Sequence, residues 1–407
     1  MSGDYNHEKP LVMHVDLNSA FATIEQQSRP LLRGKSVAIV NRLVENTSIV
    51  TASYEAKALG LKVGMKYREA KRLIPDLIAL ESDPAKYRYV YKKLMGIMND
   101  YSPHVVMKSI DEGVMDFHKL TVNRPLVEIG YEIKQRLRDE IGSVMRCNIG
   151  IGPNRFLAKT AAGLHKPDGF DVIDANNLRA TYEKMKLTDL TGIASQMEKR
   201  LNAVGIYTPI QFLDTESIAL EKIVFKSICG NQWYKRLRGY EVDDNVSTTK
   251  TIGRQYVLEN RNITKSQIAD RLHNLCESVG SRMRAQGLVA RGVFIYIRTL
   301  DRRYWHASKI CQLPFFSDIT INTLAQQLFA KTPDSIMEIG VRLYELSEQG
   351  DEQISLFNDM LVREQQLVNA VDEINQRFGD RTVHAASTLD ANKIIKQKIS
   401  FGSTRYL

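Results

Sequence analysis

The sequence predicts an α+β protein built from several domains, and three observations lead to that class. The chain has 407 residues, which is too long for one ordinary core and favours about two to four domains. Strand-like and helix-like segments alternate between residues 11 and 152, whereas the pattern from about 171 to 242 is helical. A polar, linker-like stretch over 241–250 then precedes a second, arginine-rich module in which both kinds of segment return.

The first mixed region is predicted to be a sheet with helices packed on it. Runs of β-branched and apolar residues indicate the strands, and apolar residues three or four positions apart indicate the helices. In chain order we expect a strand opening the segment 11–21, a strand over 34–40, a helix over 53–65 ending at a glycine turn, a helix over 84–99, strands over 105–110 and 113–117 joined as a hairpin, a helix over 128–142 and a strand over 147–152.

The second half follows the same reasoning. A helical region over 171–242 includes an apolar turn at Gly192 followed by a helix. Beyond the linker and the segment QYVLEN (255–260) we expect a helix near 265–286, a strand over 291–300, a helix near 319–331 and a strand-like segment over 336–346. The tail over 361–387 is amphipathic at first and then strand-like.

Composition narrows the function classes. The formal net charge of +9 favours a polyanionic partner such as nucleic acid over a merely solvated basic surface. The four cysteines lie far apart without metal-site spacing, which argues against a zinc site and for a reduced, intracellular protein. The N-terminus lacks the apolar core of a signal peptide, and no apolar stretch is long enough to span a bilayer. The sequence therefore predicts a cytoplasmic protein without a membrane partner.

Three carboxylates interrupt apolar strands. Asp16 ends the first strand, and Asp111 and Glu112 lie where the two strands of the hairpin meet. If these strands pair, the three carboxylates meet at one sheet edge, where they repel one another unless a cation lies among them. Ligands that are all oxygen favour Mg²⁺ or Mn²⁺. The alternative is that Asp111 and Glu112 form an ordinary turn and that Asp16 is a helix N-cap.

Four motifs in order resemble the Y-family, translesion DNA polymerases over residues 11–350. They are DLNSAFATIE (16–25), TASYEAKALGLKVGM (51–65), SIDEGVMD (109–116) and IGIGPNRFLAKTAAGLHKPDG (149–169). The resemblance implies a right-hand polymerase fold with palm, fingers and thumb, plus a little-finger domain. The implied divisions are a palm over 1–20 and 79–171, fingers over 21–78, a thumb over 172–242, a linker over 243–252, a little finger over 253–348 and a tail over 349–407.

The same resemblance implies a metal site and a sugar filter. Asp16, Asp111 and Glu112, with the backbone carbonyl of Leu17, would bind two Mg²⁺ ions, for which Mn²⁺ could substitute. Phe21 lies at the position of an aromatic steric gate, whose ring would clash with a ribose 2′-hydroxyl.

A triphosphate contact is implied for three further residues, Tyr54, Lys57 and Lys159, and Thr51 is a weaker candidate for the same pocket. The sequence departs from the usual family pattern at four positions without losing a metal ligand. Lysine replaces a common arginine at position 57, Ala20 stands where a second aromatic residue is common, and Gly113 replaces a common alanine. Ala194 stands at the second glycine of the usual helix-hairpin-helix turn, where a DNA phosphate would approach the backbone.

Two features point to macromolecular partners. The second module carries arginines that the family resemblance assigns to DNA phosphates, namely Arg254, Arg261, Arg282, Arg284, Arg291, Arg298, Arg302 and Arg303. The peptide QISLF then resembles the motif by which bacterial polymerases bind the sliding clamp, with Gln353, Leu356 and Phe357 as its contacts. Tethering to a clamp would raise the effective concentration of enzyme at the primer end.

We therefore predict a monomeric, low-fidelity DNA polymerase that copies damaged template in the bacterial DNA-damage (SOS) response, with primer-template DNA and deoxynucleoside triphosphates as substrates and the nucleoid as its place of action. Two alternatives remain at this stage. One is a non-catalytic subunit that binds DNA and the clamp, and the other is a different phosphoryl-transfer enzyme with the same palm, such as a nucleotide cyclase.

Overall fold

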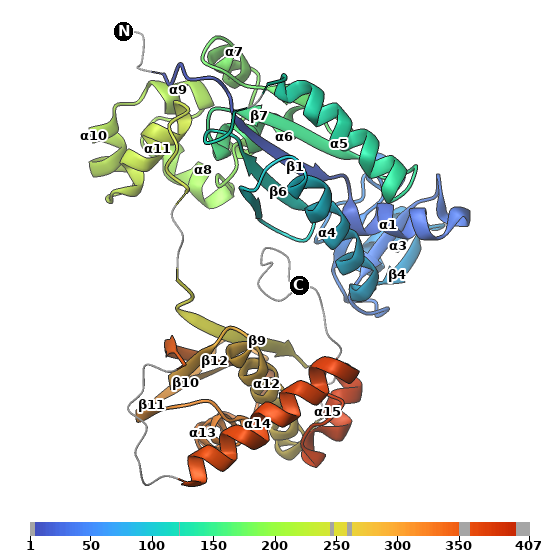
Figure 1. Ribbon diagram of the computed structural model, residues 1–407, viewed down its shortest axis with the longest axis vertical. Coiled ribbons are helices and arrows are strands. Elements are labelled where there is room, and N and C mark those ends of the chain that lie inside the picture. Colours follow the sequence, from blue (N-terminus) through green and yellow to red (C-terminus); the bar gives the residue numbers. More distant parts are fainter. Residues whose placement is uncertain (1–4, 122, 245–247, 259–262, 350–358, 396–407) are drawn as a thin grey trace. The chain divides into compact units, whose positions relative to one another are not determined.

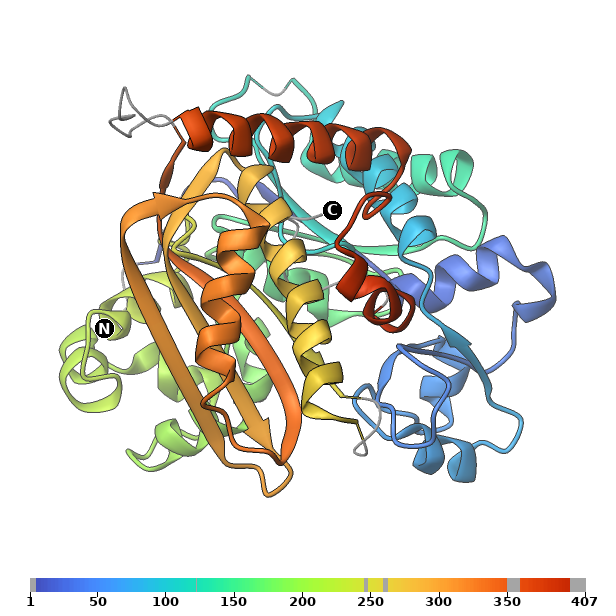
Figure 2. The ribbon, with the colours of Figure 1, turned by 90° about the horizontal axis from the view of Figure 1, so that it is seen from below.

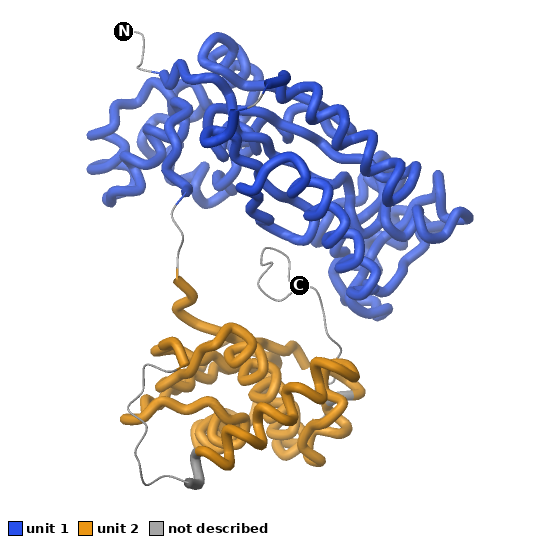
Figure 3. Tube along the Cα trace, in the orientation of Figure 1, with its two compact units in different colours: residues 1–245, 398–407 blue, residues 246–397 orange. Residues whose placement is uncertain are grey.

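The computed structural model describes residues 5–121, 123–244, 248–258, 263–349 and 359–395. The described residues fall into two compact units, one ending at residue 244 and one beginning at residue 248 (Figure 3). Among the described helices, none combines the length and the apolar composition needed to cross a membrane.

The first unit is built on a five-stranded sheet in the order β5-β6-β1-β7-β8 (Figure 1). Its strands are β1 (Val12–Leu17), β5 (Val105–Met107), β6 (Glu112–Asp116), β7 (Cys147–Gly152) and β8 (Phe170–Val172). The antiparallel β5–β6 pair is the predicted hairpin, and the predicted strand over 147–152 is also confirmed.

Helices cover both faces of this sheet because its strands are apolar on both sides. The helices are α1 (Ala20–Ser28), α4 (Pro84–Asn99), α5 (Leu126–Glu140) and α6 (Arg155–Leu164). Met13 and Val15 pack into one core with residues of α1, α4 and α5, whereas Val12 packs against Ala158 of α6 on the opposite face. Strand alternation therefore places Asp16 and His14 on the face covered by α6.

A smaller sheet of three strands, in the order β3-β2-β4, follows α1 in the sequence. It contains β2 (Val37–Val40), β3 (Ile49–Ala52) and β4 (Ile78–Glu81), with α2 (Tyr54–Ala58), α3 (Tyr67–Leu73) and a short 3₁₀ turn, η1 (Pro30–Leu32). The prediction of a helix over 53–65 is wrong in length. The helix stops early because Gly60 takes a left-handed conformation, with φ of 89°.

The helical region is confirmed. It consists of α7 (Leu178–Glu183), η2 (Leu187–Asp189), α8 (Ser195–Asn202), α9 (Pro209–Asp214), α10 (Ser217–Ala219), a π turn η3 (Leu220–Val224) and α11 (Cys229–Leu237). Tyr182, Phe212 and Trp233 are its largest buried side chains and hold these short helices in one cluster.

The second unit is a four-stranded sheet in the order β11-β10-β12-β9. Helices α12 and α13 lie side by side on one of its faces (Figure 2). The elements are β9 (Thr251–Val257), α12 (Lys265–Arg284), β10 (Leu288–Thr299), β11 (Tyr304–Phe315), α13 (Asp318–Phe329) and β12 (Ile336–Glu348). Strand β11 was not predicted. It is an edge strand that pairs with β10 alone, and its mostly exposed residues lack the apolar alternation of a half-buried strand.

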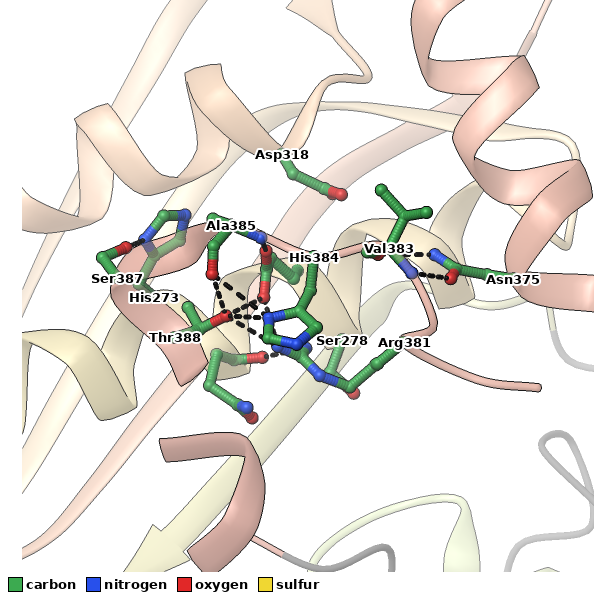
Figure 4. Close-up of polar contacts among 12 residues, drawn as sticks. His273, Ser278, Asp318, Asn375, Arg381, Val383, His384, Ala385, Ser387 and Thr388 are labelled. Carbon is green, nitrogen blue, oxygen red and sulfur yellow. Dashed lines mark hydrogen bonds and ion pairs between the residues drawn. The ribbon is translucent and has the colours of Figure 1, made fainter. Parts of the chain in front are cut away.

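Residues 359–395 belong to the second unit and do not form a loose tail. They form α14 (Asp359–Phe378), a 3₁₀ turn η4 (Ala386–Thr388) and α15 (Leu389–Ile394). The prediction of a strand-like end to this segment is wrong. Its backbone is held by α12 instead, since Glu277 accepts hydrogen bonds from the amide of Ala385 at 2.8 Å and from the Thr388 hydroxyl at 3.2 Å (Figure 4).

The ion pair between Arg381 and Glu277 anchors this segment and yields a stability prediction. Their side chains are only 10% and 12% exposed, and Arg381 also donates to the carbonyl of Asn274 at 3.3 Å. Breaking a buried pair by removing one partner costs about 3–5 kcal/mol. We expect Arg381→Met to reduce hydrogen-exchange protection of α12 peptides, measured by mass spectrometry. The matched change Lys393→Met, at a side chain that is 69% exposed, is expected to leave that protection unchanged.

Candidate active site

The structure brings the three predicted carboxylates to one edge of the large sheet. Asp16, at the end of β1, is paired in register with Glu112, at the start of β6. The backbone amide of Leu17 donates a 2.9 Å hydrogen bond to the carbonyl of Asp111, which fixes the turn against the strand. Adjacent antiparallel strands thus deliver acidic side chains from positions almost a hundred residues apart.

Each carboxylate has a partner from the protein. Lys159 contacts the two oxygens of Glu112 at 2.9 and 2.8 Å, and His14 Nε2 lies 3.2 Å from the same group. The ammonium group of Lys166 is paired with Asp16. The Ser109 hydroxyl donates to Asp111 at 2.5 Å.

The pKa values of the adjacent acidic groups move in opposite directions. Burial raises the pKa of Asp111, and the nearby charges of Asp16 and Glu112 raise it further, although Ser109 opposes this. Burial would also raise the pKa of Glu112, but hydrogen bonds and charges from His14 and Lys159 outweigh it and lower the pKa to about 2. Glu112 is thus held ionised, whereas burial and the neighbouring carboxylates disfavour ionisation of Asp111.

A pocket of about 220 Å³ opens beside these carboxylates. It is lined by Asp16, Leu17, Asn18, Ser19, Ala20, Phe21, Val50, Thr51, Tyr54, Lys57, Asp111 and Lys166. The predicted residues Phe21, Thr51, Tyr54 and Lys57 therefore converge on one cavity. Glu112 and Lys159 do not line it, and their side chains contact each other.

The pocket collects positive charge on the side that faces Asp16. Lys57 Nζ lies 2.7 Å from the Ser19 hydroxyl and 4.8 Å from the centre of the Tyr54 ring. Burial lowers the pKa of Lys57, and the neighbouring ammonium group of Lys166 lowers it further. Two ammonium groups that repel each other in a partly buried site are stabilised by an anion placed between them.

Phe21 forms part of the pocket wall and is 2% exposed. Its ring stacks on Tyr87 of α4, with centroids 4.1 Å apart and planes 5° from parallel. The Tyr87 hydroxyl lies 3.1 Å from the buried carboxylate of Glu25. Although Ala20 removes one aromatic neighbour, a fixed ring from another helix supports Phe21.

Sequence reasoning missed Lys166 and His14, which the structure places at the carboxylates. Lys166 lies in the same motif as Lys159, IGIGPNRFLAKTAAGLHKPDG. The structure distinguishes the two lysines, because Lys166 is the one paired with Asp16. His14 precedes Asp16 by two residues on β1 and so shares its face of the sheet. The alternation of side chains along this strand could therefore have identified His14 from the sequence.

The donor set fits a hard divalent ion. The carboxylate oxygens are hard ligands, and burial raises the pKa of Asp111, to which the nearby charges of Asp16 and Glu112 add. In the described part of the chain, no three acidic, histidine or cysteine side chains are grouped tightly enough to form a metal site. In the structure, lysines are paired with two of the three predicted carboxylates. The clamp-motif residues Gln353, Leu356 and Phe357 lie outside the described residues.

Known proteins resemble the chain along almost all of its length. Residues 15–163 match the impB/mucB/samB family, and residues 249–356 match the C-terminal domain of that family. A DNA polymerase IV of Pelotomaculum thermopropionicum is 30% identical, with 95% of this chain and 97% of the relative covered. A DNA polymerase IV of Moorella thermoacetica is 31% identical, with 93% and 96% covered. DNA polymerase IV 1 of Bacillus subtilis is 28% identical, with 96% of each covered.

Solved structures show the same fold. A Y-family DNA polymerase chimera of Dbh and Dpo4 superposes with a TM-score of 0.70 at 23% identity, covering 82% of this chain and 98% of the chimera. An insertion ternary complex of Dbh DNA polymerase gives a TM-score of 0.59 with the same identity and coverage. The predicted α+β polymerase fold with its C-terminal little finger is confirmed. The chain belongs to the impB/mucB/samB family, the Y-family of translesion DNA-directed DNA polymerases.

Proposed function

We propose that this polymerase adds deoxynucleotides to a primer 3′ end with two Mg²⁺ ions held by Asp16, Asp111, Glu112 and the carbonyl of Leu17. Mn²⁺ could replace Mg²⁺ in this site. The observation that carries the proposal is the convergence of three carboxylates at one sheet edge beside a cation-rich pocket. Bound divalent ions would supply charge neutralisation at the reacting phosphate oxygens.

Triphosphate recognition is proposed for Tyr54, Lys57 and Lys166, with Thr51 as a weaker contact. Lys166 takes the place first expected of Lys159, because its ammonium group lines the pocket. These cations are already in position, so little reorganisation is needed when the negatively charged tail of the nucleotide enters. Lys159 is proposed to hold Glu112 ionised and correctly oriented, which its two contacts to that carboxylate support.

Sugar selection is proposed for Phe21. The ring is buried, and its stacking on Tyr87 prevents it from swinging away from the pocket. A rigid wall beside the sugar excludes an added hydroxyl group by shape, whereas a mobile ring would move aside.

The proposed contacts with DNA and the clamp extend beyond this pocket. We keep the palm, fingers, thumb and little-finger boundaries given above, a monomeric enzyme acting at the nucleoid, and clamp binding through Gln353, Leu356 and Phe357. Not all of the arginines in the second unit are free to contact phosphates. Arg284 is 8% exposed and bridges Asp318 and Asp372 within the unit.

Single-nucleotide incorporation on a primed template tests this proposal. A chelator is expected to abolish extension, and Mg²⁺ or Mn²⁺ to restore it. Lys166→Ala should raise KM for the deoxynucleotide by about 10- to 100-fold, since one charge-assisted contact contributes about 1.5–3 kcal/mol. The control Lys62→Ala changes an exposed lysine outside the pocket lining and should leave KM unchanged. Extension that persists in chelator would contradict the metal site, and an unchanged KM in Lys166→Ala would contradict the triphosphate assignment.

A further inference from the structure

The loop over 165–169, between α6 and β8, carries Lys166 to the pocket. It is tightly folded. A Cβ atom on Gly169 would lie 1.9 Å from the carbonyl oxygen of His165, so only glycine fits there. Asp168 takes a left-handed conformation with φ of 58°, which is uncommon for a residue with a side chain. A loop of this shape needs contacts from outside to hold it.

Two buried asparagines supply some of these contacts. Asn148, which is fully buried on β7, donates from Nδ2 to the carbonyl of His165 at 3.0 Å. Asn18, which is 2% exposed and follows the end of β1, accepts from the amide of Asp168 at 2.7 Å. The two side chains are joined by a 2.8 Å hydrogen bond. The loop is therefore tied to the same strand end that carries Asp16.

Lys134 of α5 makes the strongest connection. Its side chain is only 5% exposed, and its ammonium group donates to the Cys147 carbonyl at 2.9 Å, the Asp168 carbonyl at 2.7 Å and the Asp168 carboxylate at 2.8 Å. All three of its donors are thus used. Arg138, one turn further along α5, holds the second oxygen of that carboxylate at 2.8 Å.

This arrangement does more than the fold requires. Burying an ammonium group is costly, and a well-packed apolar side chain often stabilises a core equally well. Neither Lys134 nor Asp168 lines the pocket. Their contacts instead fix a loop whose one pocket-lining side chain is Lys166. A fully satisfied polar network restricts a segment to a single geometry, which suits a role in positioning.

We infer that Lys134 and Asp168 are positioning residues for the incoming nucleotide. Through the loop over 165–169 they hold the Lys166 ammonium group at the end of the pocket nearest Asp16. The triphosphate then meets a cation that is already in place, and no binding free energy is spent on ordering the loop. This inference rests on the proposed role of Lys166.

A double-mutant cycle on the full-length enzyme tests the inference, with KM for a deoxynucleotide and kcat measured in single-nucleotide incorporation. Lys134→Met is expected to raise KM by about tenfold, because small displacements of a binding group have large effects, while kcat changes less. In a Lys166→Ala background the same change should add nothing to KM. A merely structural role would lower the fraction of active enzyme, and so kcat, without changing KM.

Asp168→Asn provides a second variant if Lys134→Met does not fold. Asparagine tolerates the left-handed conformation but loses the charge shared by Lys134 and Arg138, so KM should rise by about threefold. Arg136→Gln, a change on the same helix that removes pairs with Asp100 and Glu140, is the control and should leave KM unchanged.

The outcomes separate the two claims. If Lys166→Ala raises KM but Lys134→Met and Asp168→Asn do not, or if the effects of Lys134→Met and Lys166→Ala multiply, the inference is overturned and the role of Lys166 stands. If Lys166→Ala itself leaves KM unchanged, the proposed function of Lys166 fails first, and the inference falls with it.

Discussion

Asp111→Asn is expected to abolish primer extension while the protein remains folded. The substitution keeps the shape of the side chain and its contact with Ser109, but it removes a carboxylate that lies beside Asp16 and Glu112. Loss of a preorganised charged group at a reacting centre costs about a thousandfold in rate. Single-nucleotide incorporation with Mg²⁺ measures the effect. Extension at the wild-type rate would remove Asp111 from the proposed site.

The thermal stability of the same variant provides an independent check. A carboxyl group with a raised pKa in the folded state destabilises the protein at pH values above that pKa, because the unfolded chain ionises more readily. Asparagine removes this penalty, so the Tm of Asp111→Asn at pH 7 should equal or exceed that of the wild type. The matched control is Asp116→Asn on the same strand, where the carboxylate lies 2.9 Å from His118. It should retain extension.

Phe21→Ala is expected to admit ribonucleotides. Forcing an extra group into a filled site costs about 1–3 kcal/mol, so removing the ring should reduce discrimination against ribonucleotides by about 10- to 100-fold. The ratio of kcat/KM for a deoxynucleotide and its ribonucleotide measures this directly. An unchanged ratio would mean that Phe21 is only part of the core.

Stability needs a control in this second experiment. Phe21 is 2% exposed and stacks on Tyr87 at 4.1 Å, so its truncation should cost about 3–5 kcal/mol. Ile24, on the same helix and 4% exposed, does not line the pocket. Ile24→Ala should destabilise the protein by a similar amount, about 2–5 kcal/mol, and leave sugar discrimination intact.

Much of the fold could be predicted from the sequence because most of its strands are either apolar runs or one side of a hairpin. The meeting of Asp16 with Glu112 follows from such strands pairing at one edge. Strand β11 could not be predicted in this way. This strand pairs on one side only and most of its residues are exposed, so its sequence lacks the apolar alternation of a half-buried strand. The prediction of a strand-like segment near Val383 was wrong, because contacts with α12, and not local β propensity, decide the conformation there.

The candidate site shows the same division. Phe21, Tyr54 and Lys57 were assigned from motifs that also form local structure, and the pocket contains all three. Lys159 and Lys166 lie in one motif seven residues apart, and no local rule says which of the two reaches the cavity. That choice depends on Lys134, Asn18 and Asn148, whose side chains fix the loop from distant parts of the chain.

The return of the chain onto α12 has a consequence for reach. Glu348 ends β12 and Asp359 begins α14, and both belong to the second unit. Ten residues separate these two anchors, so at full extension they span about 35 Å. A partner bound through Leu356 and Phe357 would therefore stay close to the second unit. Lengthening that segment by an insertion would increase the distance that such a partner could reach from the second unit.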